Sequence, residues 1–369
     1  MSIYYVAPTG SDANPGTQAQ PWQTLSKAAS SVQAGDTVYF ANGSYTGGVT
    51  CHASGTAAAP ITFLSTNRWG AKIVEPAGAG MGTSLLHLAG DYTVVDGFEV
   101  TGPDAQYGIF AEGNFDTIQH NWVHDVCNTL SPGSSGGEGI SNWQTNYAGS
   151  GCTITDNRVE RIGPKDANGN ILANQYIHPI YVMCGNSAGA GTISNNLVLN
   201  GSGWGIAIYH NPNRWVVTNN TIIHCLTGGL DCWGDVNSGY IADYNTIQNN
   251  LFVDCGAPSG WKPAIWSQSD NCGAHNIFRD NLAYFHGGTA VYDYTAAKVN
   301  PLQTGTNLTN ADPKFVNYQA DGSGDYHLAS GSPAINTATS TLAPSTDFDG
   351  NPRPYGSAPD CGCYERQSA

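Results

Sequence analysis

Charged residues are scarce in this chain: they make up 11% of its 369 residues, and the 13 Lys and Arg form no run. Coiled coils and helical bundles carry many charged residues on their exposed faces, so this composition excludes both. The formal net charge of -15 argues against nucleic acid and anionic membranes as partners. No stretch approaches the roughly 18 consecutive apolar residues that a membrane-spanning helix needs.

Methionine is also rare, and the ten cysteines show none of the paired spacings typical of structural zinc sites. The cysteines favour disulfides, so we expect a secreted or periplasmic monomer whose leader has been removed. Cys225 and Cys255 should stack on neighbouring repeats, either as a disulfide or as free thiols. Abundant Thr, Asn, Val, Ile and Tyr, together with 46 glycines, predict an all-β protein rich in turns.

A short element recurs through the middle of the chain, in which a polar residue and Asn precede an apolar alternation. The shortest step between two copies separates Asn196 from Asn220, and its length suits three short strands and three turns. That is one coil of a parallel β-helix, in which longer steps carry loop insertions. We expect the repeated Asn side chains to hydrogen-bond from coil to coil as a ladder: Asn121, Asn157, Asn196, Asn220, Asn250 and Asn281.

A second element, a small residue followed by Ile or Leu, falls between the copies of the first and should stack inside the helix: Ile109, Ile140, Ile180, Ile206, Leu230 and Ile265. The predicted fold is a single-domain right-handed parallel β-helix. Residues 1–80 would form an N-terminal cap and the first coils, 81–300 the central coils, and 301–369 a C-terminal covering segment. A short helix at Trp22–Ala29 would cover the open end.

If these apolar residues are in register, chemically active side chains gather on one outer face of the solenoid. The predicted catalytic residues are His178, Tyr181, Tyr209, His210 and Asp231. Sugar rings stack on Trp and Tyr, and we expect the substrate to be bound by a second set: Glu138, Asn142, Trp204, Arg214, Trp233 and Trp266. The insertions Asn128–Gly137 and Gly163–Tyr176 would form the walls of a groove.

Motifs at both ends of the chain carry a family resemblance. At the start these are Tyr4–Asp12, Asn14–Thr17, Pro21-Trp22 and Gly35–Tyr39, and at the end Asp312–Phe315, Gly331–Ile335, Asp347–Gly350 and Pro359–Glu365. With the repeats, they resemble secreted β-helix proteins of the pectin-lyase-like superfamily, nearest in style to polysaccharide lyase family 9. The resemblance implies the fold and its caps, and it implies a carbohydrate-active protein.

In that family a lysine base works beside a calcium site built from several Asp. Leu230–Asp235 is loosely similar to that Asp-rich segment, which leaves the use of Ca²⁺ open. No Lys lies on the predicted outer face, because Lys165 and Lys262 fall in expected loops, so the catalytic lysine is not carried over. The Asn-Thr-Asp, Gly-His-Gly and Arg-Ile-Lys signatures of family 28 polygalacturonases are also absent.

The predicted function is a polysaccharide lyase that cleaves a uronate-containing glycan by β-elimination. His178 would act as base, Tyr181 or Tyr209 as acid, and His210 or Arg214 would neutralise the substrate carboxylate. The alternatives are a glycoside hydrolase pairing Asp231 with another carboxylate, a C5-epimerase, and a non-catalytic glycan-binding module.

Overall fold

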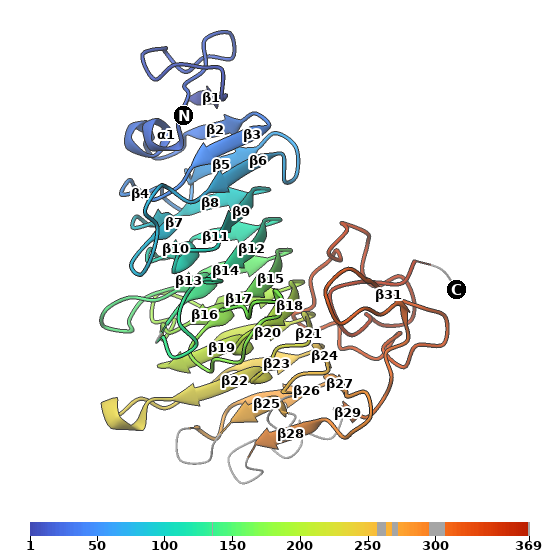
Figure 1. The fold of residues 1–369 in the computed structure, drawn as a ribbon. Helices are drawn as coiled ribbons and strands as arrows, with labels where there is room; N and C mark the ends of the chain where they lie inside the picture. The colour runs from blue at the N-terminus through green and yellow to red at the C-terminus, as the bar shows by residue number, and fades with distance from the viewer. Residues whose placement is uncertain (135, 257–262, 268–271, 295–306, 368–369) are drawn as a thin grey trace.

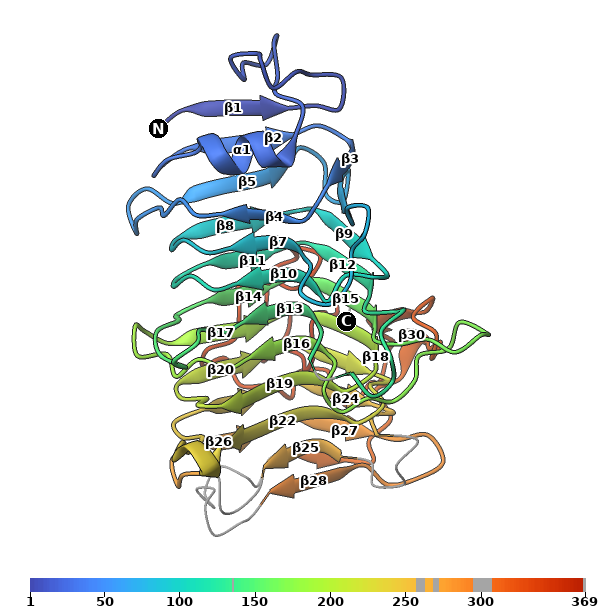
Figure 2. The ribbon, with the colours of Figure 1, turned by 60° about the vertical axis from the view of Figure 1, so that its left-hand side comes forward.

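A computed structural model describes residues 1–134, 136–256, 263–267, 272–294 and 307–367 (Figure 1). The described chain winds into a solenoid of three parallel sheets, as predicted, and each coil visits the sheets in the same order. We call them sheets 1, 2 and 3 in that order. Figure 2 shows the strands of sheet 3 stacked one below another towards the viewer.

The elements have the following bounds. Sheet 1 contains β1 Ile3–Val6, β2 Thr37–Phe40, β5 Ile61–Ser65, β8 Thr93–Asp96, β11 Thr117–Gln119, β14 Thr153–Thr155, β17 Gly191–Ser194, β20 Trp215–Thr218, β23 Thr246–Gln248 and β26 Ile277–Arg279. Sheet 2 contains β3 Gly43–Thr46, β6 Ala71–Val74, β9 Glu99–Gly102, β12 Trp122–Val126, β15 Arg158–Ile162, β18 Leu197–Gly201, β21 Thr221–Ile223, β24 Leu251–Val253, β27 Leu282–Tyr284 and β29 Leu308–Thr309. Sheet 3 contains β4 Val49–Cys51, β7 Ser84–Leu88, β10 Tyr107–Ala111, β13 Glu138–Asn142, β16 His178–Val182, β19 Trp204–His210, β22 Gly228–Gly234, β25 Pro263–Ser267 and β28 Val291–Tyr294. Outside them lie α1 Leu25–Ser31, the 3-10 turn η1 Val236–Ser238, β30 Phe315–Asn317 and β31 Asp325–Leu328.

The small residue of the second repeat has a steric cause. A Cβ on Gly205 would lie 2.4 Å from Ile222 Cγ2, and one on Gly229 would lie 2.4 Å from Phe252 Cδ1. Both glycines therefore face the interior, as does the Ile or Leu that follows each of them. Because two consecutive residues face inward, the in-out alternation of side chains is broken here. The residue before the glycine, such as Trp204, therefore points outward.

The predicted ladder of Asn side chains runs through the turn between sheets 1 and 2. In each step an Asn Nδ2 and backbone N–H donate to Oδ1 of the next Asn, at 2.9–3.1 Å for the Nδ2 bonds. Residues Asn121, Asn157, Asn196, Asn220, Asn250 and Asn281 all take part, and Asn307 continues the series. The ladder thus satisfies polar groups that would otherwise be buried without partners.

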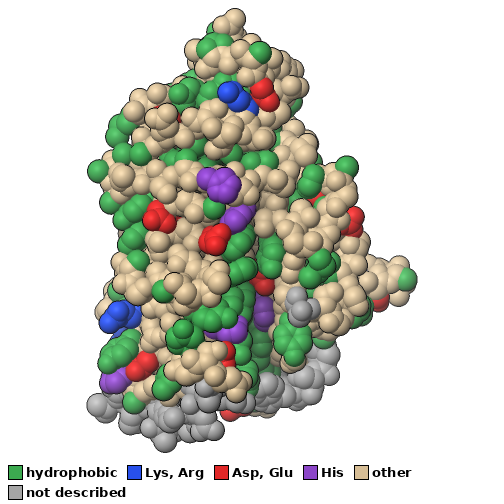
Figure 3. All heavy atoms as spheres, turned by 90° about the vertical axis from the view of Figure 1, so that its left-hand side faces the viewer, with side chains coloured by type: hydrophobic (Ala, Val, Ile, Leu, Met, Phe, Trp, Pro, Cys, Tyr) green, Lys and Arg blue, Asp and Glu red, His purple; other side chains and the backbone are tan. Residues whose placement is uncertain are grey.

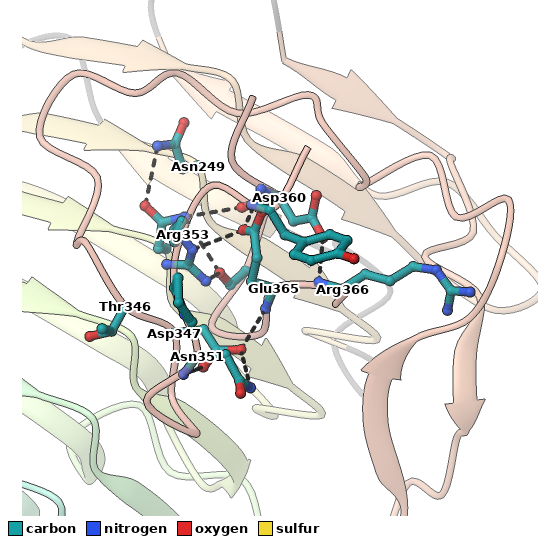
Figure 4. Close-up of polar contacts among 12 residues, drawn as sticks. Asn249, Thr346, Asp347, Asn351, Arg353, Asp360, Glu365 and Arg366 are labelled. Carbon is teal, nitrogen blue, oxygen red and sulfur yellow. Dashed lines mark hydrogen bonds and ion pairs between the residues drawn. The ribbon is translucent and has the colours of Figure 1, made fainter. Parts of the chain in front are cut away.

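The residue before each ladder Asn, not the ladder Asn itself, has left-handed backbone geometry. Three of these residues, Asn195, Asn219 and Asn249, point outward and donate to carbonyl oxygens of the C-terminal segment at 2.8–3.0 Å. Figure 4 shows the contacts around Asn249 and Arg353. Arg353 donates to Glu365 Oε2 at 3.1 Å and to Asn195 Oδ1 at 2.7 Å.

The C-terminal segment packs along the side of the solenoid, as Figure 1 shows. Its apolar side chains form a second core with the outer face of β18, β21 and β24. Tyr326, Phe348 and Cys363 bury this face together with Leu199 and Leu251. The segment therefore covers a sheet face that would otherwise expose Leu, Ile and Val to water.

Helix α1 lies at the N-terminal end, beside β4, and begins after Trp22 instead of at it. Thr24 caps the helix because its Oγ1 accepts a hydrogen bond from the Lys27 N–H at 3.0 Å, and the first helical residue, Leu25, is buried. No helix within the described residues is both long and apolar enough to span a membrane.

The ten cysteines are all free and buried, so the expectation of disulfides is wrong. Cys225 and Cys255 follow the paired strands β21 and β24 on adjacent coils and stay unbridged. Buried thiols of this kind pack as small apolar side chains, and burial raises the pKa of Cys225 to about 12.

Candidate active site

A cleft of about 620 Å³ lies on the outer face of sheet 3, over β13, β16, β19, β22 and β25. Figure 3 shows this side of the molecule, where acidic, histidine and hydrophobic side chains gather in the lower half. The cleft is lined by Gly136, Glu138, Gln175, Tyr176, His178, Tyr181, Trp204, Tyr209, His210, Thr227, Asp231, Trp233 and Trp266.

All five residues predicted as catalytic line this cleft, and four of the six predicted to bind substrate do so too. The stacking that brings them together is the predicted one: Ile180 pairs with Ile206, and Ile206 with Leu230. Gly136, Gln175 and Tyr176 come from the two insertions expected to form the walls. Loop residues have no strand register, so only their place in those insertions could have indicated them.

Asn142 and Arg214 were wrongly placed in the cleft. Asn142 pairs with Val182 in a row of interior residues, where it donates to the Ala111 carbonyl at 2.9 Å and accepts from Ser150 Oγ. Arg214 is exposed in the turn after β19 and does not line the cleft. Regular alternation from Ile140 turns Asn142 inward, and β19 ends at His210, four residues before Arg214.

Two carboxyl groups are buried at the cleft. Glu138 is 3% exposed and Asp231 5% exposed, and burial raises the pKa of each to about 8. Glu138 Oε1 accepts from the Gly137 N–H at 3.1 Å, whereas Glu138 Oε2 and Asp231 Oδ1 have no hydrogen-bond partner within the described chain. Both groups are therefore protonated at neutral pH and can donate a hydrogen bond to a ligand.

His178 is buried, and its Nδ1 accepts from the Trp204 backbone N–H at 3.1 Å. Burial lowers the pKa of His178 to about 4, so the ring is neutral. A neutral imidazole that accepts at Nδ1 carries its proton on Nε2 and can only donate there. The expected role of base does not fit this arrangement, and His178 is a hydrogen-bond donor instead.

His210 ends β19 with left-handed backbone geometry, and its Nδ1 lies 3.4 Å from Asp235 Oδ2. Burial lowers the pKa of His210 below its usual range, so its ring is neutral at pH 7. Asp235 is held as a turn residue by the Asn237 N–H and the Ser238 hydroxyl. A carboxylate facing Nδ1 favours the tautomer that leaves a basic lone pair on Nε2.

Tyrosine and tryptophan rings form the rest of the surface. Burial raises the pKa of Tyr181 well above 10, which keeps its hydroxyl protonated. Trp204 stacks on Trp266 with ring centroids 5.5 Å apart and planes 4° from parallel. Trp233 meets Trp266 edge-on at 4.9 Å and continues the strip to Tyr209. Such a strip suits the apolar faces of sugar rings.

The backbone spacing of the carboxyl residues argues against a hydrolytic pair. Glu138 and Asp231 lie three strands and three residues apart, which separates their Cα atoms by about 17 Å at ~4.8 Å per strand and ~3.3 Å per residue. Asp235 follows the end of β22, four residues after Asp231, which separates their Cα atoms by at most about 13 Å. Inverting glycosidases require ~6.5–9.5 Å between carboxyl groups, and retaining ones less. Since the values above are Cα separations, both side chains would have to extend towards each other to reach this range, so the backbone spacing argues against the paired-carboxylate alternative.

Within the described part of the chain, no three His, Cys, Asp or Glu side chains are close enough together to hold a metal ion. The Asp-rich calcium site implied by the family resemblance is therefore not matched there. Lys165 pairs with Asp125 at 2.6 Å and does not line the cleft, and Lys262 lies outside the described residues.

Comparison with known proteins agrees with this architecture. Residues 4–169 match the family model described as a Pel9A-like, right handed beta helix region. The crystal structure of pectate lyase Pel9A superposes with a TM-score of 0.61 at 19% identity, covering 99% of this chain and 96% of that one. The superposition shows that the chain shares the β-helix fold of that structure.

Three further proteins are similar to this chain. Pectate lyase L of Dickeya chrysanthemi is 22% identical over 430 residues, covering 99% of this chain and 90% of that protein. The uncharacterized protein YwoF of Bacillus subtilis (strain 168) is 28% identical over 183 residues, 45% of this chain and 38% of that protein. The complex of XylC with xylose superposes with a TM-score of 0.51 at 14% identity, covering 78% of this chain and 67% of that one.

Proposed function

We propose that this protein is a polysaccharide lyase that cleaves a uronate-containing glycan by β-elimination in the cleft on sheet 3. The observation that carries the proposal is that one cleft is lined by a neutral histidine, His210, by a protonated tyrosine, Tyr181, and by a strip of aromatic rings. The likeness to pectate lyases along almost the whole chain supports it.

The register leaves room for a sugar ring between these two side chains. Tyr181 pairs with Ala207 on the next strand, and His210 lies three residues further along, so the two Cα atoms are about 11 Å apart. Tyr209 is less suited to the role of acid, because its ring centroid lies only 4.0 Å from that of His210.

The reaction then needs two proton transfers. His210 Nε2 takes the proton from C5 of the uronate, and the electron pair of that bond forms the C4–C5 double bond. The C4–O4 bond breaks, and the departing oxygen takes the proton of the Tyr181 hydroxyl. Asp235 faces His210 Nδ1 and stabilises the imidazolium that forms.

The direct test is incubation with a panel of polysaccharides, following unsaturated uronate by absorbance together with new reducing ends. A lyase raises both signals together. Reducing ends without absorbance would identify a hydrolase, and binding without either signal would identify a glycan-binding module; each result would overturn the proposal.

A matched pair of variants locates the chemistry. His210→Ala should reduce kcat by at least ~10²-fold, as expected for loss of a general base. His275 has the same type of contact, to Asp243 at 2.8 Å, but does not line the cleft. His275→Ala should therefore keep wild-type turnover, and equal losses in the two variants would remove His210 from the mechanism.

A further inference from the structure

The charge of the cleft bears on which form of a uronate it accepts. A free uronate carries a carboxylate, and the chain that must receive it has a net charge of -15. None of the described residues that line the cleft is Lys or Arg. Moving a carboxylate out of water without a cationic partner is costly, because the lost hydration is not replaced.

The polar groups that do face the cleft are neutral hydrogen-bonding groups. Glu138 Oε2, Asp231 Oδ1 and Trp233 Nε1 belong to residues that line the cleft, and these buried atoms have no hydrogen-bond partner within the described chain. His178 adds an N–H donor at Nε2. Neutral donors of this kind suit the carbonyl and hydroxyl oxygens of an uncharged sugar.

We propose that the cleft takes uronate units whose carboxyl group is masked as a methyl ester, in preference to the free polyanion. The inference rests on the lyase function proposed above and names its substrate class. An ester carbonyl accepts hydrogen bonds from His178, Glu138 or Asp231 without burying a net charge. The ester methyl group finds apolar surface on the ring strip of Trp204, Trp233 and Trp266.

The reaction chemistry agrees with this choice. An ester withdraws more electron density from C5 than a carboxylate does, so the C5 proton is more acidic and the enolate that forms needs less stabilisation by a cation. The neutral donors on His178 and Asp231 then supply the stabilisation that the ester oxygen requires as negative charge develops on it. The bonds made and broken are those given above, and the ester group itself is unchanged.

The experiment compares pectate with its fully methyl-esterified form at pH 7, following unsaturated product. We expect kcat/KM to be at least ~10-fold higher on the ester, which corresponds to about 1.4 kcal/mol of transition-state binding. Unsaturated product formed mainly from pectate would overturn this inference and leave the lyase function standing. Reducing ends without unsaturated product would overturn both. No product from either form would overturn this inference and leave the lyase function to the polysaccharide panel described above.

A variant tests the electrostatic cause. Gln175 is exposed on the wall of the cleft, so Gln175→Arg adds a cation without disturbing the core. It should raise kcat/KM on pectate and narrow the preference several-fold, whereas the neutral control Gln175→Met should leave the ratio unchanged. An unchanged ratio in the arginine variant would show that charge does not set the preference, and would overturn the inference.

Discussion

Replacing Asp231 by Asn should stabilise the protein, by an amount that grows with pH. Burial raises the pKa of Asp231 from the ordinary 3.8 to about 8, so the folded chain holds a proton that the unfolded chain releases between these two values. Folding stability therefore falls as pH rises through this window, by 1.36 kcal/mol for each pH unit. An Asn side chain has nearly the same shape as protonated Asp and still offers a hydrogen-bond donor. Because it cannot ionise, the variant does not lose stability as pH rises.

The expected gain in unfolding free energy is about 0.6 kcal/mol at pH 4 and about 4 kcal/mol at pH 7, and it levels off at about 6 kcal/mol above pH 8. Urea-unfolding midpoints of both proteins, measured between pH 4 and pH 8.5, give the difference at each pH. Stability gained on losing an active-site acid is the usual trade-off between stability and function.

Asp235→Asn is the matched control. The Ser238 hydroxyl and other hydrogen bonds hold the pKa of Asp235 below its usual range, so this carboxylate stabilises the fold above pH 4. Its replacement should lower the midpoint at pH 7, opposite in sign to Asp231→Asn. A difference between wild type and Asp231→Asn that does not change with pH would refute the reasoning, because it would mean that Asp231 is not buried as an acid.

Further predictions concern the reaction, the ladder and the covering segment. The pH profile of kcat/KM should be bell-shaped. It should rise below pH 6.5 as His210 loses its proton, and fall near pH 8 as the two buried carboxyl groups of the cleft ionise. A flat profile from pH 5 to 9 would contradict these roles of His210 and the carboxyl groups. Tyr181→Phe should retain glycan binding by calorimetry while losing at least ~10²-fold in kcat, and a selective rise in KM would argue for a binding role instead. Asn220→Ala leaves buried groups of both neighbouring coils unpaired and should cost about 3 kcal/mol by urea unfolding; a loss below ~1 kcal/mol would show that the ladder is dispensable. Arg353→Met leaves the carboxylate of Glu365 buried without its ion pair and should lower the free energy of unfolding by ~3–5 kcal/mol. Proteolysis after residue 310 should then be faster, whereas an unchanged cleavage rate would mean that other contacts hold the segment.

The repeats were sufficient to predict the solenoid and its Asn ladder, because period and residue type together determine which side chains stack. The cleft followed from the same register, which placed Tyr181, Ala207 and Asp231 in one outward row. What the sequence could not predict depends on local departures from regular geometry. The inward step at Gly205 reverses the expected alternation, and the Trp204 N–H that decides the tautomer of His178 is visible only in three dimensions.

The Asn ladder and the loop insertions that form the cleft walls lie at different corners of each coil. Each coil is hydrogen-bonded to its neighbours at the turn between sheets 1 and 2, while the insertions lie in the turns between sheets 2 and 3, before Glu138 and His178. Loops of any length can be exchanged there without shifting the rows that carry the reacting groups. Exchange of these loops can therefore change which ligands the cleft accepts, while the strand rows beneath keep their positions.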